Sequence, residues 1–236
     1  MIIIPREDKI FPTGNKRIPI IANKKFVIVR TPKTGSCSFY YSFGHLNEDL
    51  LFLNMHMHDG IAALRHLYPK ANYPNVKYIG ISRNPYSKIL SWYFHHLRYT
   101  DKREYPDNFT QFVNDNNPPT RMHCETKKYH LIDGRWAMDI MYCFEDSVNN
   151  IISDISNIFS VKNNGIKDKN RNPRIQVMLK KMSFDSRLSF LLNHPEAIDK
   201  IRENYKEDFE FYGYSMNPED MMLPPQNHNI EYRRLQ

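Results

Sequence analysis

The sequence has few cysteines and no long hydrophobic run. Its three cysteines, Cys37, Cys124 and Cys143, are widely spaced and form no C-x-x-C pair, which argues against a disulfide framework and favours a reducing compartment. The longest apolar run covers a few residues, far fewer than the roughly 20 that a membrane-spanning helix needs. Because Met1–Ile4 is followed at once by proline and charged residues, no signal peptide is expected, and we predict a soluble, cytoplasmic protein.

Glycine is also scarce, with eight residues in a chain of 236. No glycine is followed by lysine, so the Walker pattern G-x-x-x-x-G-K-[ST] of nucleotide kinases and NTPases is absent. The chain contains 41% hydrophobic and 25% charged residues, which is ordinary for a globular protein and argues against disorder. We therefore expect residues 1–236 to form a single domain that is large enough to bury a core.

Positive charge is in excess and unevenly distributed. The chain has 33 Lys and Arg against 26 Asp and Glu, a net charge of +7. Residues 162–187 hold eight of these cations and two of the anions, so the rest of the chain is nearly neutral. This distribution favours one site for an anionic ligand over a surface that coats nucleic acid, and no nucleic-acid partner is expected. A solvated, lysine-rich loop explains the same stretch about as well.

Three short apolar runs have the length and composition of buried strands. They cover residues 26–29, 78–81 and 138–144. Each run is followed by apolar residues at helical spacing, which predicts a helix after each strand. The helix after the second strand begins at Pro85 with Asn84 as its N-cap. A last helix is predicted over 195–211. Alternating strands and helices predict an α/β fold, a three-layer α/β/α domain with a central, mainly parallel sheet. Ligands of such folds bind at the carboxyl ends of the strands.

The first of these strands leads through a polar turn directly into a helix. The residues of this turn with donors for an anion are Lys33, Thr34, Gly35, Ser36, Cys37 and Ser38. Gly35 lets the backbone approach a ligand closely, the amides at the start of the helix are unpaired, and Lys33 adds a mobile positive charge. The turn predicts a phosphate site. A polar turn with a serine cap and no ligand is the alternative.

The second strand also ends at the start of a helix. Arg83 follows this strand, and Ser91 lies eight residues later, about two helical turns away, with Ser87 between them on the same face. An arginine at a strand end and a serine on the next helix can hold one phosphate from two sides. Alone, Arg83 would be a structural residue paired with an acid, but two anion-binding patterns on successive strands favour a shared site.

Four segments resemble sulfotransferases that use 3′-phosphoadenosine 5′-phosphosulfate (PAPS), in particular the branch that acts on carbohydrates. They are Thr31–Ser38, Ser82–Tyr93, Phe144–Asp146 and Tyr205–Tyr214. The first is similar to the 5′-phosphosulfate loop of that family, and the second to its 3′-phosphate motif R-[DN]-P-x-x-R-x-x-S-x-[YF]. The sequence departs from the pattern at Lys88, where a second arginine is common, and at Cys37, which replaces a small or hydroxyl residue.

The resemblance implies a P-loop-like sulfotransferase fold and transfer of a sulfuryl group from PAPS to a hydroxyl, with a glycan as the expected acceptor. Lys33 would neutralise the bridging oxygen of the leaving 3′,5′-adenosine bisphosphate (PAP), and the loop amides would hold its 5′-phosphate. Arg83 and Ser91 would hold its 3′-phosphate. No metal would be required.

A general base is expected between the two motifs, where the family usually places a histidine or an acid. His56 and His58 form an H-x-H pair that is similar to the arrangement of glycan 2-O-sulfotransferases, in which the second histidine is the base. We therefore predict His58 as the base and His56 as the second choice. Such a pair can also bind zinc, but the sequence shows no clear third and fourth ligands.

Two further segments have expected roles. Residues 99–135 are predicted to be a long irregular insertion that forms the acceptor wall, with Arg121, His123 and Lys127 facing an acidic glycan. The basic stretch 162–187 occupies the place of the family loop that closes over the cofactor, with Arg171 as its predicted contact. Two other functions stay open: a P-loop-like nucleotide kinase, and a non-catalytic relative that binds an anionic glycan.

Overall fold

The structure is a computed structural model that describes nine parts of the chain. They are residues 20–22, 25–29, 31–43, 61, 74–97, 108–114, 126–165, 183–226 and 230–233. Within these parts, no helix is both long enough and apolar enough to cross a lipid bilayer.

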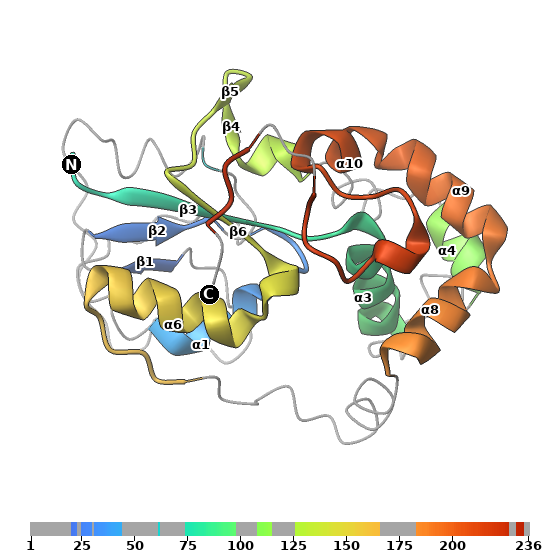
Figure 1. The fold of residues 1–236 in the computed structure, drawn as a ribbon, viewed down its shortest axis with the longest axis horizontal. Helices are drawn as coiled ribbons and strands as arrows, with labels where there is room; N and C mark the ends of the chain where they lie inside the picture. The colour runs from blue at the N-terminus through green and yellow to red at the C-terminus, as the bar shows by residue number, and fades with distance from the viewer. Residues whose placement is uncertain are drawn as a thin grey trace.

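The three predicted strands lie side by side in a four-stranded sheet with the order β1-β2-β3-β6 (Figure 1). The bounds are β1 Ile20–Ala22, β2 Phe26–Ile28, β3 Lys77–Ser82 and β6 Ile140–Cys143. β2, β3 and β6 are parallel, whereas β1 pairs antiparallel with β2. The carboxyl ends of the three parallel strands therefore lie along one edge of the sheet.

A helix follows each parallel strand, as the helical spacing predicts. These helices are α1 Ser36–Phe43, α3 Pro85–Leu97 and α6 Val148–Phe159. The predicted cap of α3 is present, because the Asn84 Oδ1 accepts a hydrogen bond of 3.0 Å from the amide of Tyr86. Each helix starts at the same edge of the sheet, so the turns before α1 and α3 face the same region.

The end of the chain forms shorter helices than expected. They are α8 Phe184–Leu192, α9 Pro195–Asn204 and α10 Lys206–Tyr212, followed by the 3₁₀ turn η4 Pro218–Asp220. The prediction of one helix over 195–211 is wrong, since the chain leaves helical geometry at Tyr205, with φ −116°. The break turns Asp208 of α10 toward Thr126, whose amide donates to both carboxylate oxygens at 2.9 Å.

The segment 99–135 contains regular structure where it is described. Its elements are α4 Phe109–Asn114, the 3₁₀ turn η2 Lys127–Tyr129, and the strands β4 Leu131–Ile132 and β5 Arg135–Trp136, which form a separate hairpin. α4 buries Phe109, Phe112 and Val113, one side of a short helix. The expectation of an irregular insertion is therefore wrong for these residues: α4 packs into the core, and the hairpin is regular although its strand residues are half-buried or exposed.

The sheet buries side chains on both faces. Phe26, Ile28, Ile79 and Ile81 pack with residues of α1 and α6 in one cluster, and the residues that alternate with them belong to a second cluster with α3, α4, α9 and α10. Figure 1 shows α1 and α6 beside the sheet, while α3, α4, α8 and α9 gather beyond the carboxyl end of β3. The fold is mixed α/β with a small, mostly parallel sheet; the three-layer, P-loop-like assignment stays a prediction.

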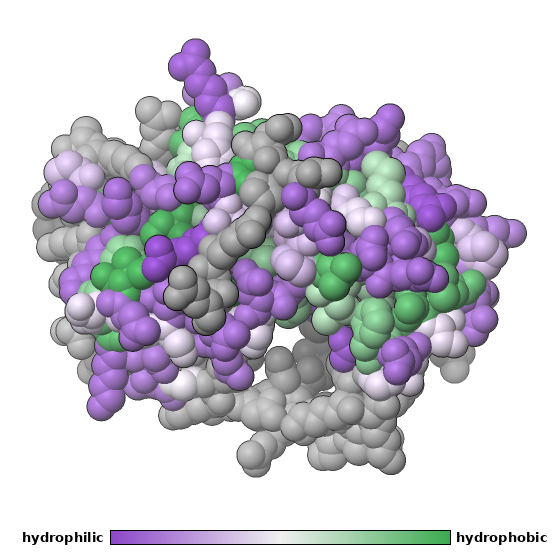
Figure 2. Space-filling model, in the orientation of Figure 1, coloured by the Kyte–Doolittle hydropathy of each residue, from purple (hydrophilic) through white to green (hydrophobic). Residues whose placement is uncertain are grey.

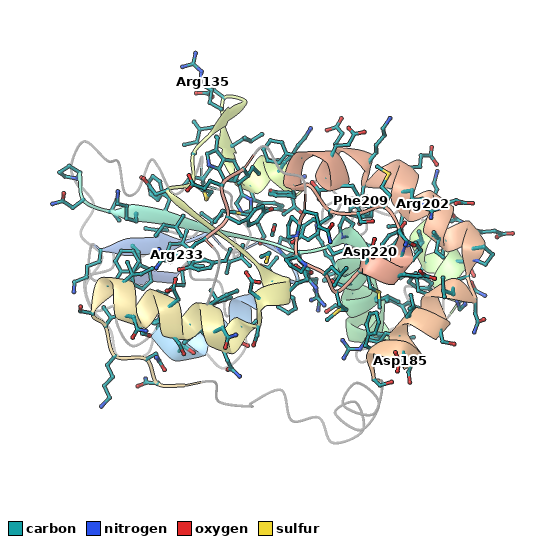
Figure 3. The ribbon with its side chains drawn as sticks, in the orientation of Figure 1. Arg135, Asp185, Arg202, Phe209, Asp220 and Arg233 are labelled. Carbon is teal, nitrogen blue, oxygen red and sulfur yellow. The ribbon has the colours of Figure 1, made fainter. Side chains whose placement is uncertain are left out.

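Polar side chains cover most of the visible surface in Figure 2, and apolar ones gather around α4 and α8. Phe184 and Leu192 at the two ends of α8 belong to the exposed large hydrophobic residues. In Figure 3, Arg135 points away from the body of the molecule at the tip of the β4–β5 hairpin, and Arg233 reaches toward α6.

Candidate anion site at the carboxyl edge of the sheet

The turn between β2 and α1 has two residues in the left-handed backbone region. Lys33 has φ +62° and Gly35 has φ +78°. A Cβ atom at Gly35 would lie 3.0 Å from Cγ2 of Val148 and 3.2 Å from Cε2 of Phe144, so the turn packs closely against the start of α6. Turns that include left-handed residues can form the concave arrangements of backbone amides that bind anions.

Two buried hydroxyls hold this turn together. Thr31 Oγ1 donates to the carbonyl of Ile81 at 2.9 Å, and the Thr34 hydroxyl lies 2.7 Å from Thr31 Oγ1 and 2.9 Å from the Thr31 carbonyl. Because a hydroxyl has one hydrogen, Thr34 uses its donor inside the loop. The expectation that the Thr34 hydroxyl donates to a phosphate is therefore corrected: this residue can offer an anion its backbone amide.

The amides at the start of α1 are positioned for a ligand. Those of Ser38 and Phe39 donate to the Gly35 carbonyl at 2.8 and 3.2 Å, whereas those of Gly35, Ser36 and Cys37 have no backbone acceptor among the described residues. The side chains of Ser36 and Cys37 lie outside the described part of the structure. A helix start with open amides carries partial positive charge, as the sequence indicates for this turn.

Arg83 joins the two predicted turns. Its Nη1 donates to the backbone oxygen of Lys33 at 2.7 Å, and its Nε donates to Ser87 Oγ at 2.9 Å. Two of its five N–H groups are used in this way, and the others have no acceptor among the described residues. The structure thus brings together the strand-end residues that the sequence predicts to meet.

The Arg83 guanidinium is buried, with 8% of the residue exposed, and lies 4.1 Å from the centre of the Phe144 ring. Burial lowers its pKa to about 10; the carboxylate of Glu145 opposes this shift, and the positive charge of Arg187 adds to it. The side chain stays charged at neutral pH, so it can act as an anion-binding group.

Glu145 supports the start of α3 from the neighbouring strand end. It belongs to η3 (Phe144–Asp146), and its carboxylate accepts from the amide of Asn84 at 3.0 Å and from the hydroxyl of Tyr214 at 2.9 Å. Burial raises the pKa of Glu145, and the Asn84 amide and the Arg83 charge oppose that shift. Glu145 therefore stabilises the turn between β3 and α3, which carries Arg83, through its bond to the Asn84 amide.

A pocket of about 210 Å³ opens beside Arg83. Its polar lining consists of Arg83, Ser87, Ser91 and Arg187, and its apolar lining includes Met221 and Met222. Ser91 thus shares a pocket with Arg83, as the two-turn spacing predicts. Arg187 of α8 is a site residue that the sequence reasoning counted only as part of the basic stretch, because nothing in the sequence showed that α8 folds back over α3.

The two remaining lysines of the motifs have different surroundings. The ammonium of Lys33 lies 5.6 Å from the centre of the Trp92 ring, next to Ser91 in the sequence. Lys88 is 1% exposed and binds Thr126 Oγ1 and, at 3.8 Å, the carboxylate of Asp208. Lys88 therefore belongs to the core, and its departure from the family pattern does not change the anion pocket.

Other predicted residues cannot be placed at this site. His56, His58, Arg121, His123 and Arg171 lie outside the described residues. Lys127, predicted to contact the acceptor, forms an ion pair with Glu207 of α10. Within the described parts of the chain, no group of three or more His, Cys, Asp or Glu side chains is arranged to hold a metal ion.

The fold and the site define an α/β protein with a basic pocket at the carboxyl edge of its sheet. Comparison of the chain with family models, with curated proteins and with solved structures finds no match in any of the three.

Proposed function

We propose that this chain is a PAPS-dependent sulfotransferase that acts on a hydroxyl, with a carbohydrate as the expected acceptor and a P-loop-like sulfotransferase fold. The observation that carries the proposal is the hydrogen bond from Arg83 Nη1 to the Lys33 carbonyl, at 2.7 Å. It places the turn suited to a 5′-phosphosulfate next to the residues suited to a 3′-phosphate, as a nucleotide with phosphates on both sides of one ribose requires.

The donor nucleotide would bind across the two turns. The open amides at the start of α1 would hold the 5′-phosphate, and Arg83, Ser91 and Arg187 would hold the 3′-phosphate. Two guanidinium groups at one small pocket suit a phosphate monoester, which carries close to two negative charges at neutral pH. A pocket that needs this doubly charged phosphate would distinguish PAPS from nucleotides that lack a 3′-phosphate.

The reaction would be an in-line substitution at sulfur. The acceptor oxygen attacks the sulfur, the bond from sulfur to the bridging oxygen of the 5′-phosphate breaks, PAP leaves, and the proton of the acceptor passes to a base, for which His58 is the predicted residue. Lys33 would move from the Trp92 ring to the bridging oxygen as negative charge develops there. Positioning and electrostatics would supply most of the rate enhancement, as in phosphoryl transfer.

The test is calorimetric titration with PAP, with 5′-AMP and with magnesium ATP. We expect PAP to bind at least tenfold more tightly than 5′-AMP, because only PAP can use Arg83 and Arg187. Arg83→Lys should weaken PAP by about 10- to 100-fold and leave 5′-AMP nearly unchanged, since a charged hydrogen bond contributes about 1.5–3 kcal/mol. Arg135→Lys, exposed at the tip of the β4–β5 hairpin and away from both turns, is the matched control and should bind PAP normally (Figure 3).

The outcomes separate the competing functions. Equal affinity for PAP and 5′-AMP would contradict the proposal, and a preference for magnesium ATP would support a nucleotide kinase. Normal PAP binding without transfer of sulfate from radiolabelled PAPS to any of a panel of glycans would favour the non-catalytic relative.

A further inference from the structure

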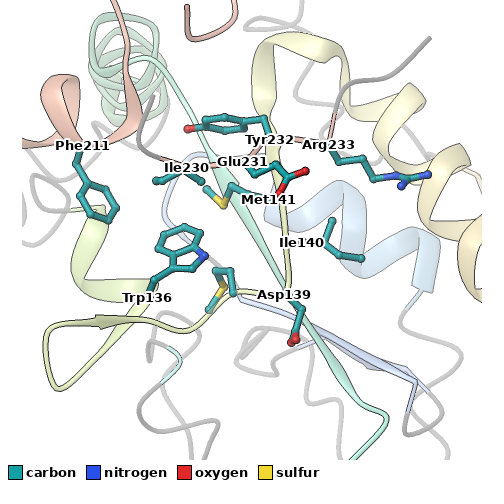
Figure 4. Close-up of a pocket in the computed structure, with 10 residues that line it drawn as sticks. Trp136, Asp139, Ile140, Met141, Phe211, Ile230, Glu231, Tyr232 and Arg233 are labelled. Carbon is teal, nitrogen blue, oxygen red and sulfur yellow. The ribbon is translucent and has the colours of Figure 1, made fainter. Parts of the chain in front are cut away.

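A second pocket lies along β6 and is separate from the pocket beside Arg83. It has a volume of about 560 Å³ and lies between β5, β6, α10 and the C-terminal segment 230–233 (Figure 4). It shares no lining residue with the pocket beside Arg83. Its volume falls within the range of about 300–1,000 Å³ that is usual for small-molecule sites.

One wall of this pocket is aromatic. The rings of Trp136 and Phe211 are 5.8 Å apart and tilted by 52°, and Trp136 is 38% exposed. Behind Trp136, the buried ring of His130 lies 6.0 Å away and bonds through Nδ1 to the Tyr212 hydroxyl. Burial lowers the pKa of His130 to about 3, so the ring is neutral and places no positive charge behind the aromatic wall.

The floor is apolar and the opposite rim is acidic. Met138 and Met141 are buried beneath the pocket, and Figure 4 shows Glu231 and Asp139 on the side away from Phe211. Glu231 is exposed and forms no ion pair among the described residues. Asp139 accepts from the amide of Tyr78 at 2.8 Å and has Lys77 at 3.9 Å.

The nearby arginines do not cancel this negative charge. Arg233 also lines the pocket, but its guanidinium forms a two-point ion pair with Asp154 of α6, which compensates its charge. Arg135 points outward at the tip of the β4–β5 hairpin (Figure 3). An aromatic pocket with an acidic rim suits a cation, even though the chain as a whole carries a net charge of +7.

We propose that this pocket binds a small molecule that carries an alkylammonium group. The faces of aromatic rings attract such cations, which lose little hydration when they enter an apolar site, and a carboxylate at the rim supplies the counter-charge. The ammonium lies against Trp136 and Phe211, its alkyl groups contact Met138 and Met141, and Glu231 faces its charge. This site is independent of the anion site and of the proposed reaction.

Tryptophan fluorescence tests the proposal, because the chain has two tryptophans, Trp92 and Trp136. In a Trp92→Phe background, which leaves Trp136 as the reporter, we expect choline to change the emission with a saturable dependence on concentration. The neutral isostere 3,3-dimethylbutan-1-ol, which replaces the ammonium nitrogen with carbon, should bind at least tenfold more weakly.

A second variant separates charge recognition from simple apolar binding. Glu231→Gln removes the exposed rim charge without altering the core and should weaken choline binding three- to tenfold. Glu196→Gln, on the surface of α9, is the matched control and should bind as the parent does. Absence of a saturable response to choline, equal binding of choline and its neutral isostere, or equal affinity of both glutamate variants would each overturn the proposal.

Discussion

Arg83 keeps its charge in a buried position because several groups compensate for the lost water. The Lys33 carbonyl and the Ser87 hydroxyl accept two of its hydrogens, the Phe144 ring lies 4.1 Å from its guanidinium carbon, and the carboxylate of Glu145 supplies an opposing charge. All but the carboxylate are neutral, so the guanidinium retains affinity for an anion. The sequence has no Walker pattern, and in this turn the Arg83 side chain instead holds the backbone of Lys33.

His130 should make the protein less stable in mild acid. Its pKa is lowered by burial to about 3 in the folded chain, against about 6.5 when unfolded, so the folded state binds fewer protons between these values. The free energy of unfolding therefore falls as the pH drops below about 6.5. His130→Gln removes this dependence, and its deficit relative to the parent should shrink by roughly 2 kcal/mol from pH 7 to pH 5.

Urea unfolding of both proteins at pH 5, 6 and 7, followed by circular dichroism, measures this difference. The deficit of the variant at pH 7 reports lost packing and the lost bond to Tyr212. The change of this deficit with pH reports protonation of His130 alone. If the free energies of unfolding of parent and variant change in parallel with pH, the assignment of a neutral, buried His130 is contradicted.

The turn before α1 needs glycine at position 35 for its positive φ and for its close packing against α6. Gly134 shares the positive φ without the close packing and so serves as a control. Gly35 and Gly134 both have positive φ, +78° and +74°, but a Cβ at Gly134 meets nothing within 4 Å, whereas one at Gly35 meets Val148 and Phe144. Gly134→Ala should cost about 1–2 kcal/mol of stability from backbone strain alone. Gly35→Ala should cost more and also weaken PAP binding, because relief of the contact displaces the amides that we propose hold the 5′-phosphate.

Thermal unfolding and PAP titration of the two variants test this expectation. If Gly35→Ala matches Gly134→Ala in stability and retains the PAP affinity of the parent, then close packing of the turn against α6 does not shape the anion site.

The elements show what the sequence could predict. Short apolar runs followed by helical spacing located β2, β3 and β6 with their helices, and the cap at Asn84 placed the start of α3, because these signals are local. The break at Tyr205 was missed because it depends on a tertiary bond from Asp208 to the amide of Thr126, 82 residues away. α4 was missed because asparagines and prolines on both sides of it obscured its three buried residues.

The same distinction applies to the candidate site. Lys33, Arg83 and Ser91 were found from strand ends and helical spacing, which the chain determines locally. The place of Arg187 in the pocket and the hydrogen bond from Tyr214 to Glu145 could not be predicted, because both depend on how distant parts of the chain pack. The roles of His58 and Arg171 stay predictions, since both residues lie outside the described parts.

At the scale of the whole molecule, one buried ion pair connects distant parts of the chain. Lys88 of α3 binds Asp208 of α10 at 3.8 Å and the hydroxyl of Thr126, and the Asp208 carboxylate also accepts from the amide of Lys127 at 3.2 Å. Lys88 and Asp208 are 1% and 3% exposed. This cluster fixes the last helices and the segment after residue 125 to the helix that carries Ser87 and Ser91.

Removal of one partner should therefore destabilise the entire protein. Lys88→Met leaves the Asp208 charge buried without a cation and should lower the free energy of unfolding by about 3–5 kcal/mol, in a single cooperative transition. The double variant Lys88→Met/Asp208→Asn should recover part of this loss, because the side-chain carbonyl of Asn still accepts a hydrogen bond from the amide of Thr126 but carries no charge.

Lys200→Met, in an exposed pair with Glu203, is the matched control and should change stability by less than about 1 kcal/mol. Urea unfolding at pH 7 measures all three, and a Lys88→Met protein as stable as Lys200→Met would mean that the cluster does not hold α10 and the segment after residue 125 against α3.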